Sequence, residues 1–219
     1  MDAIQLASFL DHTLLKPEAT QEQMEALCAE AKRYGFASVC VLPYWVKHCA
    51  DLLSDSKVKV CTVVGFPLGA HALKTKVMET REAIKAGAQE IDMVINIGAF
   101  KSGHLQHVEE EIKAVVAEAA DHALVKVIIE TGLLTKDEKA TICQMILDSG
   151  AHFVKTSTGF SAPGATVEDV RLIRSIVQGR LGIKASGGIR TYDQAMAMIK
   201  AGATRLGSSS SLAIVGSAP

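Results

Sequence analysis

Hydrophobic positions along this chain repeat with two spacings, and the two follow each other in a constant order. An amphipathic stretch, with apolar residues three or four positions apart, is followed by a glycine and then by a short apolar run. Met24, Leu27, Cys28 and Ala31 show the first spacing, which is typical of a buried helix face. The unit recurs at 29–43, 82–96, 145–158 and 197–210. Each copy predicts a helix, a turn and a strand.

Glycine and threonine mark the ends of the predicted helices. Glycine readily takes the left-handed conformation that closes a helix, and we expect this at the glycines of the repeated unit. They are Gly35, Gly87, Gly150 and Gly202. A threonine followed three residues later by Gln or Glu predicts a capping box, in which each side chain accepts a hydrogen bond from the other residue's backbone. Such pairs are Thr20 with Gln23, Thr135 with Glu138, and Thr191 with Gln194.

Along the whole chain, these signals predict eight strands that alternate with about eight helices. Strands are expected near 9–15, 38–42, 58–65, 90–96, 124–131, 153–157, 181–186 and 204–207. Helices are expected near 20–34, 44–54, 71–86, 105–120, 136–149, 166–178, 191–201 and 209–215. Strict alternation implies parallel strands, because each crossover helix returns the chain to the same end of the sheet.

Eight such units favour a closed (β/α)8 barrel of the α/β class, the TIM barrel, in a single domain over residues 1–219. No linker or shift of composition divides the chain. The alternative is an open doubly wound sheet. Such sheets usually have fewer strands, and no G-x-G-x-x-G motif follows the first predicted strand.

Composition argues against several classes of function. The formal net charge is -1 and no basic block occurs, so nothing marks a nucleic-acid surface. No apolar run approaches the roughly 18 residues of a membrane helix, and the N-terminus lacks the basic start of a signal peptide. We expect a cytoplasmic protein without a nucleic-acid or membrane partner.

Cysteine and histidine do not indicate a metal site. The five cysteines form no C-x-x-C motif and are an odd number, which favours reduced thiols that pack as small hydrophobes. His104 and His107 have i, i+3 spacing at a predicted helix start, but the sequence places no third ligand beside them. A surface helix face is the better interpretation of this pair.

Two lysines at the carboxyl ends of predicted strands are the main candidates for chemistry, because active sites of such barrels lie at that end. Lys155 in FVKTST and Lys184 in GIKASGG occupy corresponding places in consecutive strands, so both amines could point into one barrel. Lysine is rare inside a strand unless its amine is used or reaches solvent. We expect Lys155 to be a nucleophile that forms a Schiff base.

The pairing of the two lysines has a chemical reason. A free lysine is protonated at neutral pH and cannot attack a carbonyl. A second ammonium group about 5 Å away, at an effective dielectric of about 20, costs about 3 kcal/mol and so favours the uncharged amine. The alternative is that each is an interior lysine paired with an acid. Lys126 shows that such lysines occur here, although it lies near the start of its strand and so toward the opposite end of the barrel.

Asp92 lies in the middle of the predicted strand EIDMVIN. It could move protons while a carbinolamine forms, loses water and makes a C–C bond. It could also be the buried counter-ion of one lysine, and the two roles do not exclude each other. Asp11, in the first predicted strand, could be that counter-ion instead.

Glycine and serine close the last two predicted strands, in SGGIR (186–190) and GSSSS (207–211). Backbone amides of glycine-rich turns bind phosphate, and the loops after strands seven and eight often form a phosphate site in barrels. Candidates for a phosphate site are Gly187, Gly188, Ser208 and Ser209, with Arg190 as a further possibility. The alternative is a pair of ordinary tight turns in which serine caps a helix.

Six segments of the chain together carry a resemblance to a known family. They are DHTLLKP (11–17), VVGFPLG (63–69), EIDMVIN (90–96), KVIIETG (126–132), FVKTSTGF (153–160) and IKASGGIR (183–190). They resemble the deoxyribose-phosphate aldolases, class I enzymes of deoxynucleoside breakdown. The similarity runs from about residue 8 to about residue 212, and KTSTG followed by KASGG is specific.

The resemblance implies a (β/α)8 barrel that reversibly cleaves 2-deoxy-D-ribose 5-phosphate to D-glyceraldehyde 3-phosphate and acetaldehyde. Lys155 would form the Schiff base, Lys184 would favour its uncharged amine, and Asp92 would act in the proton relay through a water. The phosphate would be held by Gly159, Gly187, Gly188, Ser208 and Ser209. No metal or other cofactor is required, the partners are the phosphorylated sugar and acetaldehyde, and the family suggests a homodimer.

Two positions depart from patterns found in some family members. A lysine that can follow TSTG is replaced by Phe160, which removes one charge partner of the phosphate. A C-terminal tyrosine that helps proton transfer in some members has no counterpart, since no tyrosine follows Tyr192. We expect slower catalysis or a weaker preference for phosphorylated acceptors, while the covalent mechanism depends on neither residue.

Two other functions fit a lysine beside a phosphate site. In a pyridoxal-phosphate enzyme the lysine would bind the cofactor and the phosphate would be the cofactor's own, but Lys184 then has no evident role. In a non-catalytic sugar-phosphate binder Lys155 would not need to be nucleophilic. The aldolase is the preferred hypothesis.

Overall fold

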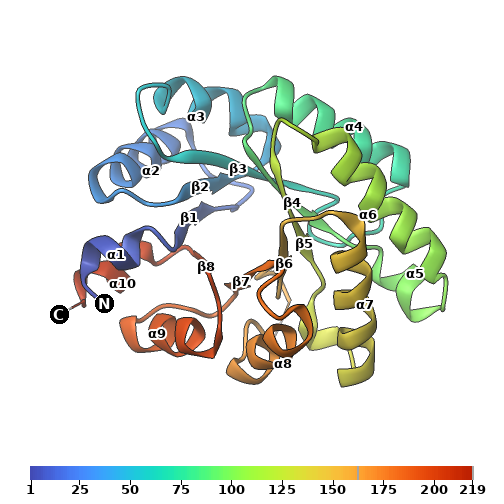
Figure 1. The fold of residues 1–219 in the computed structure, drawn as a ribbon. Coiled ribbons are helices and arrows are strands. Elements are labelled where there is room, and N and C mark those ends of the chain that lie inside the picture. Colours follow the sequence, from blue (N-terminus) through green and yellow to red (C-terminus); the bar gives the residue numbers. More distant parts are fainter. Residues whose placement is uncertain (162, 219) are drawn as a thin grey trace.

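Eight parallel strands close into a barrel in the computed structural model, which describes residues 1–161 and 163–218. The strands are β1 (Leu10–Leu14), β2 (Ser38–Val41), β3 (Lys59–Val64), β4 (Glu90–Val94), β5 (Leu124–Ile128), β6 (Phe153–Lys155), β7 (Gly182–Ser186) and β8 (Arg205–Ser208). Strands that are consecutive in the sequence are neighbours, and β8 pairs with β1 to complete the ring. Figure 1 shows this ring surrounded by helices. The predicted (β/α)8 barrel is confirmed, and the open sheet is excluded.

Helices connect the strands at the predicted places. They are α2 (Gln21–Tyr34), α3 (Val46–Leu52), α4 (Leu73–Lys85), α6 (Leu105–Ala119), α7 (Lys136–Ser149), α8 (Val167–Val177), α9 (Tyr192–Ala201) and α10 (Ser211–Gly216). A short 3-10 turn, η1 (Pro43–Trp45), precedes α3. The prediction missed α1 (Ala3–Ala7), α5 (Ile97–Lys101) and the turn η2 (Thr131–Leu133). Elements of about one turn are too short to show a hydrophobic period.

The predicted helix ends are present in the structure. All three capping boxes form, at Thr20, Thr135 and Thr191. The four glycines of the repeated unit have positive φ, with values of 68° at Gly35, 108° at Gly87, 82° at Gly150 and 122° at Gly202. A side chain at such a φ is strained, so glycine is what allows each helix to end and the following strand to begin at once.

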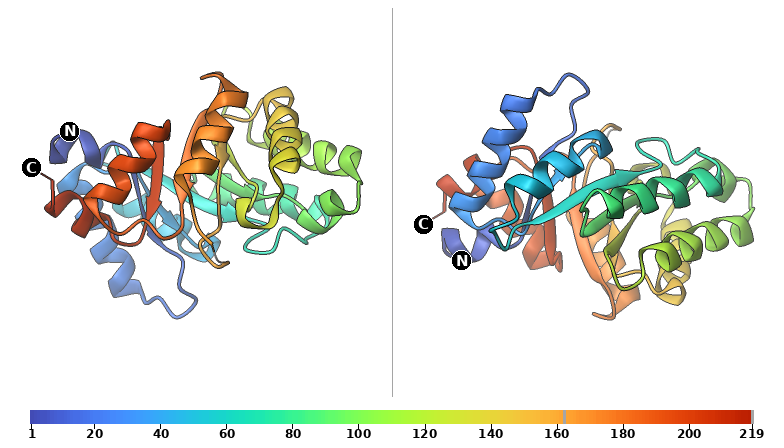
Figure 2. Two further views of the ribbon diagram at one scale, coloured as in Figure 1. Left: turned by 90° about the horizontal axis from the view of Figure 1, so that it is seen from below. Right: turned by 90° about the horizontal axis from the view of Figure 1, so that it is seen from above.

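Apolar side chains fill the layer between the barrel and the helices. The predicted face of α2 is buried there, and all five cysteines are buried free thiols. Figure 2 shows that the first and last segments of the chain lie side by side, and α1 contacts α10. Among the described residues, no helix combines the length and the apolar character that a membrane crossing needs.

The register of the strands determines which side chains meet inside the barrel. Asp92 on β4 lies opposite Lys126 on β5, and Lys155 on β6 lies opposite Lys184 on β7. Because side chains alternate between the two faces of a strand, Glu90 shares the inner face with Asp92. This register places charged side chains at neighbouring levels of the barrel interior.

Candidate active site

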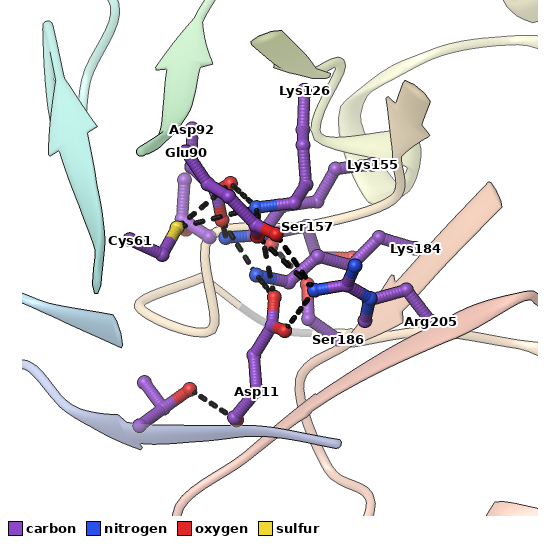
Figure 3. A network of polar contacts seen from close by, with 12 residues as sticks. Asp11, Cys61, Glu90, Asp92, Lys126, Lys155, Ser157, Lys184, Ser186 and Arg205 are labelled. Atoms are coloured by element: carbon purple, nitrogen blue, oxygen red, sulfur yellow. Dashed lines mark hydrogen bonds and ion pairs between the residues drawn. The ribbon is translucent and has the colours of Figure 1, made fainter. Parts of the chain in front are cut away.

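A cluster of charged side chains fills the barrel interior, and six of the eight strands contribute to it (Figure 3). Its members are Asp11 from β1, Glu90 and Asp92 from β4, Lys126 from β5, Lys155 from β6, Lys184 from β7 and Arg205 from β8. The carboxylates and the lysines are buried, and Arg205 is largely so. Buried charges are stable only when they are paired, so the contacts within this cluster determine what each group can do.

Asp92 is the centre of the cluster. Its Oδ2 accepts hydrogen bonds from the ammonium groups of both Lys155 and Lys184, each at 2.7 Å. Its Oδ1 accepts one from Lys126 at 2.8 Å. The two lysines that the sequence singled out therefore share one carboxylate oxygen.

Asp11 forms a second bridge across the barrel. It pairs with Lys184 through Oδ2, and its Oδ1 accepts a hydrogen bond from Arg205 at 2.7 Å. Arg205 also contacts Glu90 at 3.1 Å, and Glu90 pairs with Lys126 at 2.6 Å. Lys184 is thus held by two carboxylates, whereas Lys155 contacts Asp92 alone among the carboxylates of the described residues.

The pKa values of the cluster follow from these contacts. Burial alone would raise the pKa of Asp92, but the ammonium groups of Lys126, Lys155 and Lys184 outweigh it and hold that pKa well below its usual range. Burial would lower the pKa of Lys184, but Asp11 and Asp92 outweigh it and raise that pKa above its ordinary value. Asp92 is therefore a carboxylate, and Lys184 an ammonium ion, at neutral pH.

A cavity of about 310 Å³ opens next to this cluster, above Lys155 and Lys184. Each glycine and serine proposed from the sequence as a phosphate ligand lines it, namely Gly159, Gly187, Gly188, Ser208 and Ser209. Gly187 has φ of 88°, and a Cβ atom there would lie 3.0 Å from Cα of Gly164. Only glycine fits at that turn, which leaves its backbone open to the cavity.

The residues from 6 to 216 match the model of the DeoC/LacD family of aldolases. The chain belongs to this family. The aldolase is 62% identical to the deoxyribose-phosphate aldolase of Streptococcus gordonii over 212 residues, which cover 97% of this chain and 96% of that one. It is 58% identical to deoxyribose-phosphate aldolase 1 of Bacillus licheniformis over 211 residues, which cover 96% of this chain and 95% of that one.

Solved structures agree with this assignment. The tetrameric deoxyribose phosphate aldolase from Aeropyrum pernix superposes on this aldolase with a TM-score of 0.92 at 34% identity, covering 99% of this chain and 92% of that one. A second aldolase structure, QR15, superposes with a TM-score of 0.93 at 43% identity, covering 97% and 95% of the two chains. The family resemblance stated from the sequence is confirmed.

Lys126 differs from its sequence-based interpretation. Its backbone lies at the middle of β5, opposite Asp92, and it does not line the cavity. Its side chain, however, extends to Asp92 and Glu90, so its amine belongs to the same cluster. The length of a lysine side chain allows this reach, which its position along the strand does not reveal.

Sequence reasoning missed several other residues of the site. Glu90 lies two residues before Asp92, and this i, i+2 spacing on a strand was an available signal for a shared face. Arg205 gave no such signal, because its partners come from β1 and β4. Lys16, in the loop after β1, lines the cavity together with Arg190 and adds a cation there.

Phe160 lies at the mouth of the cavity with 56% of its surface exposed. Its ring packs edge-on against Phe66, with the ring centroids 5.1 Å apart. An apolar ring therefore borders the cavity at the place where some family members have a lysine.

Among the described residues, two groups of three side chains have metal-ligand geometry, and each includes at least one carboxylate of the charged cluster. They are Cys40, Cys61 and Asp92, and Asp11, Cys61 and Glu90. Their carboxylates already bind ammonium or guanidinium groups, which compete with a cation. His104 and His107 join neither group.

Proposed function

We propose that this aldolase reversibly cleaves 2-deoxy-D-ribose 5-phosphate to D-glyceraldehyde 3-phosphate and acetaldehyde, through a Schiff base on Lys155. One observation carries the assignment of the nucleophile. Lys155 lines the cavity and shares Asp92 Oδ2, its single carboxylate partner among the described residues, with Lys184.

The balance of charge in the cluster favours Lys155 as the amine that reacts. The three carboxylates are Asp11, Glu90 and Asp92, and the four cations are Lys126, Lys155, Lys184 and Arg205. If Lys155 releases its proton, three anions face three cations. Lys126 and Arg205 do not line the cavity, and Lys184 has two carboxylate partners to stabilise its charge.

The covalent steps follow from an uncharged amine at this position. The nitrogen of Lys155 adds to the aldehyde carbon of the sugar, and the carbinolamine loses water to give a protonated imine. The C3 hydroxyl then releases its proton as the C2–C3 bond breaks. The electron pair of that bond moves toward the imine, which becomes an enamine, and D-glyceraldehyde 3-phosphate departs. Protonation of the enamine carbon and hydrolysis release acetaldehyde and the amine.

Lys184 and Asp92 support these steps in different ways. The fixed charge of Lys184 disfavours a second ammonium at Lys155. Asp92 connects the two nitrogens through one oxygen, which fits a proton relay between them through a water. Its low pKa means that it holds a proton only briefly, as a relay group does, and is a carboxylate between steps.

The phosphate of the sugar is bound at the far side of the cavity in this proposal. Backbone amides of Gly159, Gly187 and Gly188 and the hydroxyl of Ser209 supply hydrogen-bond donors, as glycine-rich turns do in other phosphate sites. Ser208 also lines the cavity, and its hydroxyl donates to the carbonyl of Ile189 at 2.7 Å, so it contributes to the site by holding the turn. Lys16 and Arg190 also line the cavity, and their positive charges offset the phosphate charge that Phe160 does not. A homodimer in the cytoplasm stays the expectation for the assembly and its place in the cell.

The test is borohydride trapping. The protein is incubated with acetaldehyde, reduced and digested, and mass spectrometry locates the added ethyl group. We expect the label on Lys155, and less label at neutral pH in Lys184→Leu. A label on Lys126, or on no lysine, would disprove the nucleophile. An absorbance near 400 nm in the purified protein would instead indicate bound pyridoxal phosphate.

A further inference from the structure

Glu130, just beyond β5, has a backbone that interrupts the regular pairing with the end of β6. The amide of Ile129 donates to the carbonyl of Lys155, and the amide of Thr131 donates to the carbonyl of Thr156. Between these two hydrogen bonds the segment after β5 advances two residues, from Ile129 to Thr131, while the segment after β6 advances only one, from Lys155 to Thr156. Glu130 is therefore the extra residue of a bulge. Its φ of 49° lies in the left-handed region, which is strained for a residue other than glycine.

The bulge turns the side chain of Glu130 toward the loop that follows Lys155. Its carboxylate is buried, and Oε2 accepts hydrogen bonds from the hydroxyl of Thr158 at 2.5 Å and from the amide of Thr158 at 3.3 Å. Its other oxygen, Oε1, is buried without a hydrogen-bond partner among the described residues. A strained backbone and a buried, partly unsatisfied carboxylate both reduce stability, so their function has to be sought at Thr158.

The hydrogen bonds of Thr158 leave it one way to contact a ligand. Its hydroxyl proton is donated to Glu130, and its Oγ1 accepts the amide of Phe160 at 3.1 Å. A hydroxyl has one proton and two lone pairs, so a single lone pair remains. Because Thr158 lines the cavity beside Lys155, this lone pair is available to a hydrogen-bond donor there.

We propose that Glu130 is a positioning residue that holds the Thr158 hydroxyl as an acceptor for a hydroxyl group of the substrate, an inference that rests on the aldolase reaction proposed above. It gives the enzyme a preference for acceptor aldehydes that carry a hydroxyl next to the carbonyl. A site built to hydrogen-bond a substrate hydroxyl discriminates against an analogue without it, because its own polar group is then left unpaired.

The experiment compares two acceptors in the direction of synthesis, with acetaldehyde as donor. One is D-glyceraldehyde 3-phosphate, and the other is 3-oxopropyl phosphate, which keeps the phosphate and lacks the hydroxyl. In Glu130→Gln the side-chain amide can donate to Thr158 Oγ1 and occupy its free lone pair. We expect kcat/KM to fall about tenfold for the hydroxylated acceptor and less than about twofold for the other.

Further variants separate positioning from folding. Thr158→Val should also lower kcat/KM selectively for the hydroxylated acceptor, whereas Thr158→Ser, which keeps the hydroxyl, should retain the wild-type preference. The double variant of Glu130→Gln and Thr158→Val should have the same kcat/KM as Thr158→Val alone. Glu130→Asp, whose shorter side chain does not reach Thr158, should behave like Glu130→Gln and replaces it if Glu130→Gln does not fold. Glu79→Gln is the matched control, because Glu79 also accepts a backbone amide, that of Gly65 at 2.8 Å, but does not line the cavity.

If Glu130→Gln lowers kcat/KM equally for both acceptors, or for neither, Glu130 does not position Thr158 for a substrate hydroxyl. The proposed reaction would still stand in that case, provided that the wild-type enzyme turns over D-glyceraldehyde 3-phosphate and acetaldehyde. A wild-type enzyme that uses neither acceptor and traps no acetaldehyde would overturn the proposed function, and this inference with it.

Discussion

Two buried lysines of this aldolase have opposite relations to their surroundings. Lys155 lies inside the barrel, borders a cavity, and shares with Lys184 the one carboxylate that it contacts in the described part of the chain. Lys76 lies outside the barrel on α4, where it pairs with Glu111 of α6 at 2.7 Å and donates to the carbonyl of Val94 at 2.7 Å. Lys76 is entirely buried and does not line that cavity.

The difference shows that burial of a lysine does not by itself make it reactive. Burial lowers the pKa of Lys76, although Glu111 opposes this, and yet no carbonyl compound can reach its amine through that cavity. Lys155, by contrast, shares its carboxylate counter-ion with Lys184, and a ligand in the cavity can reach it. Access and competition for one carboxylate are therefore better markers of a nucleophilic lysine than burial alone.

The largest effect on activity is expected when Lys155, the reactive lysine of the two, is replaced. Lys155→Leu removes the nitrogen that forms the Schiff base, and kcat should fall at least about a thousandfold while the fold is kept. Activity and circular dichroism on the same sample measure this. Retention of more than a tenth of the activity would contradict the covalent role.

On the structural side, Lys76→Met leaves the carboxylate of Glu111 buried without its cation. We expect the free energy of unfolding to drop by about 3–5 kcal/mol, with activity per folded molecule unchanged. The double variant of Lys76→Met and Glu111→Leu should recover most of this loss, since removal of both charges avoids the unpaired one. Urea denaturation checks both, and a double variant less stable than the single one would argue against the ion pair as the cause.

The pH dependence of kcat/KM in a Lys184 variant tests whether Lys184 acts through its charge. Lys184→Leu removes the positive charge that shares Asp92 Oδ2 with the amine of Lys155, so kcat/KM at pH 7 should fall about a hundredfold, which corresponds to about 3 kcal/mol. The loss should shrink as the pH is raised. A loss that stays constant with pH would mean that Lys184 acts through position and not through charge.

Phe160→Lys tests the mouth of the cavity. A cation there should lower KM for 2-deoxy-D-ribose 5-phosphate by about fivefold, because exposed ion pairs contribute at most about 1 kcal/mol. The unphosphorylated sugar is the control and should be unaffected. An unchanged KM for the phosphorylated substrate would show that this position does not contact the phosphate.

The smallest effect concerns His12, which is buried on β1 and contacts Glu30 at 2.7 Å. Burial lowers its pKa below 6.5, with Glu30 opposing, so the unfolded chain binds the proton more readily than the folded protein. Stability should therefore fall slightly as the pH drops below about 6.5. Urea midpoints at pH 7.5 and 5.5 should differ less in His12→Gln than in the wild type.

Much of the fold was predictable, because local rules and the global architecture agree. Each strand prediction matches a strand of the barrel, and the capping boxes place the starts of α2, α7 and α9. The short helices α1 and α5 escaped prediction because they begin at single polar caps, Asp2 and Asn96, without a hydrophobic repeat behind them.

The site was predictable in part. The corresponding places of Lys155 and Lys184 in consecutive strands, and the place of Asp92 in the middle of another, indicated that the three side chains converge, since a barrel brings the inner faces of its strands together. Their sharing of one carboxylate depends on strand register and side-chain reach, which no local pattern encodes. The bulge at Glu130 could not be predicted for the same reason, because a bulge is defined by hydrogen bonds to the neighbouring strand.

The contact between Asp11 and Arg205 has a consequence for how the protein is made. The two residues are 194 positions apart, on the first and last strands of the ring. A ribosome releases Asp11 early and Arg205 near the end, and a chain still lacking β8 would bury Asp11 and Glu90 without their guanidinium partner. We therefore expect these carboxylates to stay hydrated in the nascent chain, and the charged centre to assemble only after the last strand has been synthesised.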